Sequence, residues 1–95
     1  MTRGHRPPIA LGDYKAQKMD EGATPVVDEN GVTHLIPPPA MWSDDAVAAA
    51  TAGDVVAASK ALLGDDGYTS FVEGGGSAAL LMSIIEDEQG ATPGE

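Results

Sequence analysis

The sequence predicts a mainly α-helical fold, and regular punctuation of its second half is the first reason. Between residues 40 and 90, four short runs of helix-forming and apolar residues each follow a Ser or Asp and end at a Gly. Ser or Asp at an N-cap accepts hydrogen bonds from free backbone N–H groups, and Gly just past the end closes the helix. The caps are Ser43, Asp54, Asp65 and Ser77, and the closing glycines are Gly53, Gly64, Gly74 and Gly90.

These signals predict a small bundle of about four short helices, at roughly 44–52, 55–63, 66–73 and 78–89. The core is expected to consist of large apolar residues from these helices and the segment before them. Its predicted members are Trp42, Leu62, Leu63, Tyr68, Phe71, Leu80 and Ile84.

A β-hairpin is predicted before the bundle, at about residues 25–36. Two β-branched runs flank Asn30-Gly31, the dipeptide best suited to a two-residue type I′ turn. A turn centred there places His34 opposite Val27. Because an isolated hairpin is barely stable in water, it must pack on the helices or on another chain.

The first 23 residues are expected to form an extended arm that is flexible or becomes ordered on a partner. Their apolar residues Ile9, Leu11 and Tyr14 are too sparse to build a core but can anchor the arm on another protein. The chain thus divides into an arm (1–23), a hairpin with a triple-Pro linker (24–39), a helical domain (40–90) and a tail (91–95).

The charge is strongly negative and unevenly distributed. The formal net charge is -10, and four of the five basic residues lie in the first 18 positions. An acidic body repels phosphate backbones, so the helical part is not expected to bind nucleic acid. With no apolar run of the length that spans a membrane and no apolar core of a secretory signal, the protein is expected in the cytoplasm.

Residue types that form catalytic, phosphate-binding or metal-binding sites in other proteins do not combine into such a site in this sequence. Gly74-Gly75-Gly76 before a helix resembles a phosphate loop, but neither a preceding strand nor a basic residue accompanies it. The paired acids are expected at helix starts and on solvated faces, and His34 is expected to be a packing residue. We predict no catalytic residue, cofactor or metal, and no enzymatic activity.

The last helix carries more apolar surface than a bundle needs. Its six apolar residues cover an arc of about 200°, wider than the roughly 100° stripe of an ordinary surface helix. We expect one side to face the bundle and the other, formed by Leu81, Met82 and Ile85, to contact another protein, with self-association as a further possibility.

Several packing and turn residues between about 25 and 90 together resemble the tail assembly chaperones of long-tailed, siphovirus-type phages of actinobacteria, in the short form. The resemblance consists of a hairpin ending in Pro, a Trp before an Ala-rich helix, a Gly-Asp step, an LLG segment with Tyr and Phe, and a Gly-Gly-Ser turn. The matching residues are Pro37, Trp42, Gly53, Asp54, Leu62, Leu63, Gly64, Tyr68, Phe71, Gly75, Gly76, Ser77 and Leu80.

The resemblance implies a non-enzymatic protein that binds the tape measure protein and helps recruit tail tube subunits in the cytoplasm of the infected bacterial host. One alternative is a minor structural protein of the phage virion, bound to a capsid or tail lattice through its N-terminal arm. Another is an acidic inhibitor that mimics nucleic acid, suggested by the fourteen acids after residue 18.

Overall fold

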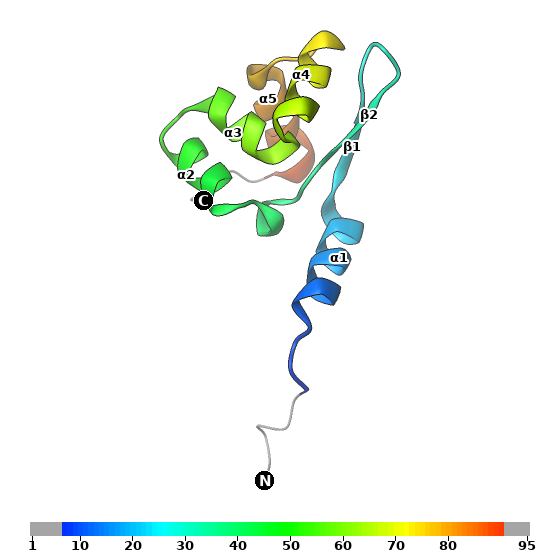
Figure 1. Cartoon of the computed structure of the whole chain (residues 1–95), viewed down its shortest axis with the longest axis vertical. Helices are drawn as coiled ribbons and strands as arrows, with labels where there is room; N and C mark the ends of the chain where they lie inside the picture. The colour runs from blue at the N-terminus through cyan, green and yellow to red at the C-terminus, as the bar shows by residue number, and fades with distance from the viewer. Residues whose placement is uncertain (1–6, 91–95) are drawn as a thin grey trace.

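The four predicted helices form close to their expected bounds in the computed structural model, which describes residues 7–90. The predicted fold class is confirmed: the described chain is mainly helical and contains one two-stranded antiparallel hairpin (Figure 1). The predicted tail at 91–95 and the first six residues of the predicted arm lie outside the described residues. In order, the elements are α1 (Leu11–Gly22), β1 (Thr24–Val27), β2 (Thr33–Ile36), the 3-10 helix η1 (Pro39–Met41), α2 (Asp44–Thr51), α3 (Val55–Leu63), α4 (Asp65–Glu73) and α5 (Ala78–Gln89).

Three of the four predicted N-caps are confirmed. The side chains of Ser43, Asp54 and Ser77 each accept a hydrogen bond from the backbone N–H three residues later. The prediction for Asp65 is wrong, because α4 already begins at this residue and its N-cap is Gly64. Asp65 instead lies in the first turn, where its carboxylate interacts favourably with the helix dipole.

The hairpin forms where expected, but its predicted register is wrong by one residue. His34 lies opposite Val26, and Val27 lies opposite Thr33. A type I′ turn needs positive φ at both central residues, whereas here only Gly31 has it, with φ of 83°. The Asp28 N–H donates to the Val32 carbonyl oxygen and the Gly31 N–H to that of Asp28, which produces a longer, three-residue loop.

The hairpin supplies part of the hydrophobic core. Its inward face carries His34 and the fully buried Ile36, while Leu35 on the other face is exposed. The indole N–H of Trp42 donates to the Pro37 carbonyl oxygen at 3.1 Å, and this bond ties the Pro linker to the helices. The core cluster consists of Ile36, Trp42, Ala46, Phe71, Leu81 and Ile85, and Leu62, Leu63, Met82 and Ile84 pack partly buried against it.

The predicted orientation of α5 is wrong. Leu81 and Ile85, predicted to be exposed, are 0% and 2% exposed in the core, whereas Leu80, predicted to be in the core, is 51% exposed. Ile84 is partly buried, as is Met82. Of the other predicted core residues, Trp42 and Phe71 are buried, and Leu62, Leu63 and Tyr68 are partly buried.

The predicted arm contains a helix, α1, which is not among the four helices that the sequence predicts. Helix α1 has no buried residue and extends away from the body beyond one end of the hairpin (Figure 1). Local contacts support it, including hydrogen bonding from Gln17 to Glu21 and an ion pair between Lys18 and Glu21. Such i,i+3 and i,i+4 pairs are worth only about 0.2–0.5 kcal/mol each. None of the helices in the described part of the chain is long and apolar enough to cross a membrane.

Candidate protein-interaction groove

Two adjoining hollows run between the first strand and the last helix and share Ile84 in their walls. We call them together the β1–α5 groove. Their volumes are about 290 and 170 Å³, each below the roughly 300–1,000 Å³ of a small-molecule pocket. One is lined by Thr24, Pro25, Val26, Ile84, Asp87 and Glu88, and the other by Val27, Asp28, Glu29, Phe71, Gly74, Gly75, Gly76, Leu80 and Ile84.

Apolar side chains from both elements reach solvent in this groove. Val27 is 65% exposed and Leu80 is 51% exposed, and Val26 and Ile84 are partly buried beside them. Isolated exposed apolar residues are common on protein surfaces, but a contiguous set with polar edges is typical of an interaction site. The groove therefore has the composition of a contact surface for another protein.

The edges of the groove are acidic. Asp87 and Glu88 line one hollow and Glu29 the other, and all three residues are exposed. None of the residues that line the two hollows is basic. The groove therefore favours a partner segment that combines apolar side chains with Lys or Arg.

The Gly74–Gly76 turn fixes one end of the groove by receiving the hairpin loop. The Glu29 N–H donates to the Gly74 carbonyl oxygen at 2.9 Å, and the Asn30 side-chain amide donates to that of Glu73 at 3.4 Å. A Cβ on any of the three glycines would collide with a side chain. Gly74 faces Asp28, Gly75 faces Glu29, and Gly76 faces Phe71. This close approach gives the three glycines a packing role.

A buried Asp–His pair holds the hairpin loop in shape. Asp28 Oδ1 accepts hydrogen bonds from the backbone N–H groups of Asn30 and Val32, at 2.8 and 2.9 Å. Its Oδ2 accepts from His34 Nε2 at 2.8 Å, and the two side chains are only 2% and 6% exposed. The His34 ring also packs edge-on against Phe71 with centroids 5.4 Å apart.

The hydrogen bond from His34 is the main reason why the pKa of Asp28 is lowered, followed by that from the Val32 N–H; burial acts in the opposite direction. The predicted packing role of His34 is confirmed by its burial and its contact with Phe71. The aspartate partner was not expected, because the predicted register did not bring Asp28 and His34 together. Their geometry stabilises the loop that borders the groove.

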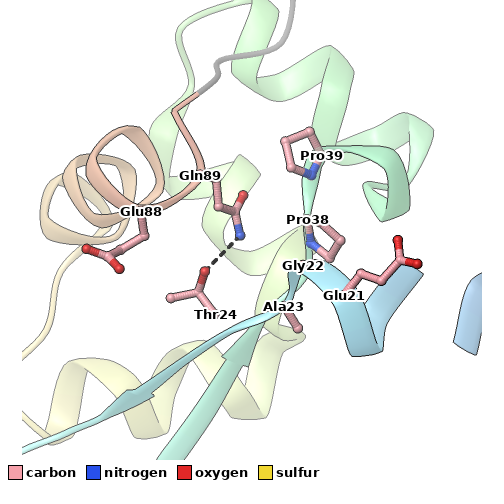
Figure 2. A pocket seen from close by; sticks show the side chains of 8 residues that line it. All are labelled: Glu21, Gly22, Ala23, Thr24, Pro38, Pro39, Glu88 and Gln89. Carbon is pink, nitrogen blue, oxygen red and sulfur yellow. Dashed lines mark hydrogen bonds between the residues drawn. The ribbon is translucent and has the colours of Figure 1, made fainter. Parts of the chain in front are cut away.

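Gln89 fixes the other end of the groove. Figure 2 shows its side chain pointing from the end of α5 toward Thr24, in a hollow of about 410 Å³ beside Pro38 and Pro39. Its Nε2 lies 3.3 Å from Thr24 Oγ1, 3.4 Å from the Ile36 carbonyl oxygen and 3.2 Å from that of Pro37. These contacts join α5 to both strands and to the linker, so the groove has a defined width.

The structure brings only part of the predicted interaction set to the surface. Leu81 and Ile85 are core residues, and Met82 packs partly buried against the core. Ile9, Leu11 and Tyr14 are exposed as predicted, at 76%, 69% and 43%. The groove residues Val27, Glu29 and Asp87 were missed, because nothing in the sequence indicates that β1 and α5 lie side by side.

The described residues contain no cluster of three or more His, Cys, Asp or Glu side chains able to hold a metal ion. Comparisons of the chain with protein-family models, with curated proteins and with solved structures found no match. The fold and the groove together describe a small acidic helical domain with an apolar groove that has acidic edges.

Proposed function

We propose that this chain is a non-enzymatic assembly chaperone that holds a client protein in its β1–α5 groove. The observation that supports this most is the exposed pair Val27 and Leu80 within an acidic border, on a chain with a net charge of -10. Exposed apolar surface binds the client, while the high charge keeps the chaperone soluble.

The client segment is best explained as an amphipathic helix with basic flanks. Pro25 lacks the N–H group that a third strand would use, so β1 is a poor template for adding a strand. A helix can instead lay apolar anchors between Val27 and Leu80 and direct Lys or Arg toward Glu29 and Asp87. The resemblance to tail assembly chaperones suggests the tape measure protein as the client. Recruitment of tail tube subunits, in the cytoplasm of the infected host, would follow from its binding.

The direct test is co-expression of the full chain with the tape measure protein of the same genome. We expect the wild-type chain to increase the soluble fraction of that client and to be recovered with it. Leu80→Gln removes the apolar anchor without adding charge and should lose this effect. The matched control is Leu35→Gln, the same substitution at an exposed leucine of β2 that does not line the groove, which should retain it.

Two outcomes would count against this function. A client whose solubility is unaffected by the wild-type chain contradicts the chaperone role itself. Equal client recovery with Leu80→Gln and with the wild type contradicts the assignment of the groove. Far-UV circular dichroism of both variants shows whether each remains folded.

A second candidate is a minor structural protein of the phage virion, and helix α1 is the observation that favours it. The helix extends the molecule to 57 Å along its longest axis and buries none of its own residues. An arm of this kind suits attachment to neighbouring subunits in a lattice. Mass spectrometry of purified virions separates the two functions, because a lattice protein is present in many copies and an assembly chaperone is absent.

A further inference from the structure

Helix α1 presents an apolar face that the described residues, 7–90, leave exposed. Leu11 and Tyr14 lie one turn apart and are 69% and 43% exposed. The N-cap residue, Ala10, makes no side-chain capping bond. A helix of twelve residues is marginal in water without tertiary packing, so its formation calls for a surface that covers this face.

A hollow of about 690 Å³ separates this face from the body. Leu11 and Tyr14 form one wall, Met41 and Trp42 contribute to the other, and Lys15 and Asp44 also line it. The far end of α1 is packed against the linker, because Gly22 lies so close to Pro38 that a Cβ would come within 2.9 Å of the Pro38 Cβ. This contact joins α1 to the body at the end of the helix away from the hollow.

We infer that α1 of a second copy fills this hollow, and that α1 of this chain fills the same hollow of the second copy. The first support is the charge of the chain. Residues 23–90 carry eleven acids and a single base, Lys60, so two bodies repel each other, whereas α1 carries three acids and two lysines. The α1 end is therefore where two copies approach with the least repulsion.

The second support is that the hollow is self-complementary. It contains apolar residues on both walls, one cation at Lys15 and one anion at Asp44. In a two-fold arrangement, a contact from one copy is repeated by the other, so each Lys15 can pair with Asp44 of the other copy. The reciprocal contact buries Leu11 and Tyr14 of both copies. Because each copy uses the same surface, the assembly stops at a dimer.

Sedimentation velocity of the full chain over a range of concentrations tests this inference. We expect the 9.7 kDa chain to shift toward twice that mass as concentration rises. Leu11→Gln should raise the dissociation constant at least about tenfold, since a buried leucine is lost from each copy. Leu80→Gln, at the β1–α5 groove, should leave the dissociation constant unchanged.

A charge exchange provides a second, independent measurement. Lys15→Glu and Asp44→Lys should each weaken the dimer, and the double variant should restore it, provided that circular dichroism shows folded chains. A wild-type chain that stays monomeric at its highest soluble concentration would overturn the inference. So would equal effects of Leu11→Gln and Leu80→Gln, or a double variant no better than the single ones. The proposed chaperone function is not assumed here, because its own test depends on Leu80.

Discussion

Adjacent leucines on α5 offer the sharpest test of how this helix is oriented. Leu81 is fully buried, and replacing a buried leucine with alanine usually costs about 2–5 kcal/mol in unfolding free energy. Leu80 is already 51% exposed, so Leu80→Ala should cost less than about 1 kcal/mol, with the better helix propensity of alanine offsetting part of it. At about 0.05–0.15 kcal/mol per residue, a 95-residue chain has only about 5–14 kcal/mol in total. Leu81→Ala therefore removes a large part of the stability.

Urea unfolding of the two variants and the wild type measures this difference. Far-UV circular dichroism reports the helices, and fluorescence reports the surroundings of Trp42, the only tryptophan in the chain and a member of the same core cluster. The expected order of stability is wild type, then Leu80→Ala, then Leu81→Ala, with similar m-values. If Leu80→Ala costs as much as Leu81→Ala, Leu80 is buried as deeply as Leu81, and the assignment of Leu80 to the β1–α5 groove is wrong.

Other predictions concern the loop that borders the groove. The pKa of Asp28 is held below the ordinary value of about 3.9, so its stabilising contribution is present above that pH and is lost as pH falls through the lowered pKa. In a plot of unfolding free energy against pH, Asp28→Asn should therefore reduce the loss of stability at acid pH, whereas Asp87→Asn, at an exposed residue, should not. Identical plots for the two variants would contradict the role of the Asp28–His34 pair. Gly74→Ala should cost about 1–3 kcal/mol by thermal or urea unfolding, because the new methyl group meets Asp28. Gly12→Ala, with open space around its Cβ, should be neutral or stabilising, and an equal loss in both variants would show that the close approach at Gly74 is unimportant.

The local signals in the sequence were sufficient for the helices of the second half. The hydroxyl of Ser43 and the carboxylate of Asp54 act within one helical turn, so their capping roles depend on neighbouring residues alone. The positive φ values of Gly53, Gly64 and Gly90 likewise follow from where the helices end. Interactions of this short range are the ones that a single sequence can indicate.

The register of the hairpin and the helix in the arm depend on hydrogen bonds made by polar side chains. Asn30-Gly31 is compatible with a two-residue turn, but the Asp28 carboxylate accepts two loop N–H groups and stabilises the longer loop. In α1, apolar spacing gave no signal, whereas the hydrogen bond from Gln17 to Glu21 shows that polar i,i+4 spacing was the available indication.

The orientation of α5 required information from the rest of the fold. Six apolar residues spread over a wide arc do not determine which side packs inward, because either choice buries large side chains. The position of the hairpin determines the orientation of α5. Ile36 packs with Leu81 and Ile85 in the core cluster, and Leu80 lies beside Val27 at the surface. A two-stranded element predicted from one dipeptide thus decides which residues of a distant helix remain exposed.

The docked hairpin loop contributes both to the stability of this chain and to the shape of the β1–α5 groove. The loop that bears Glu29 is held by the Asp28–His34 pair on one side and by the carbonyl oxygen of Gly74 on the other. Val27 and Leu80 form one surface only while that loop stays docked. A change at the Gly74–Gly76 turn should therefore weaken client binding and stability together, whereas Leu80→Gln should weaken client binding alone. This separation distinguishes a residue that contacts the client from one that shapes the groove.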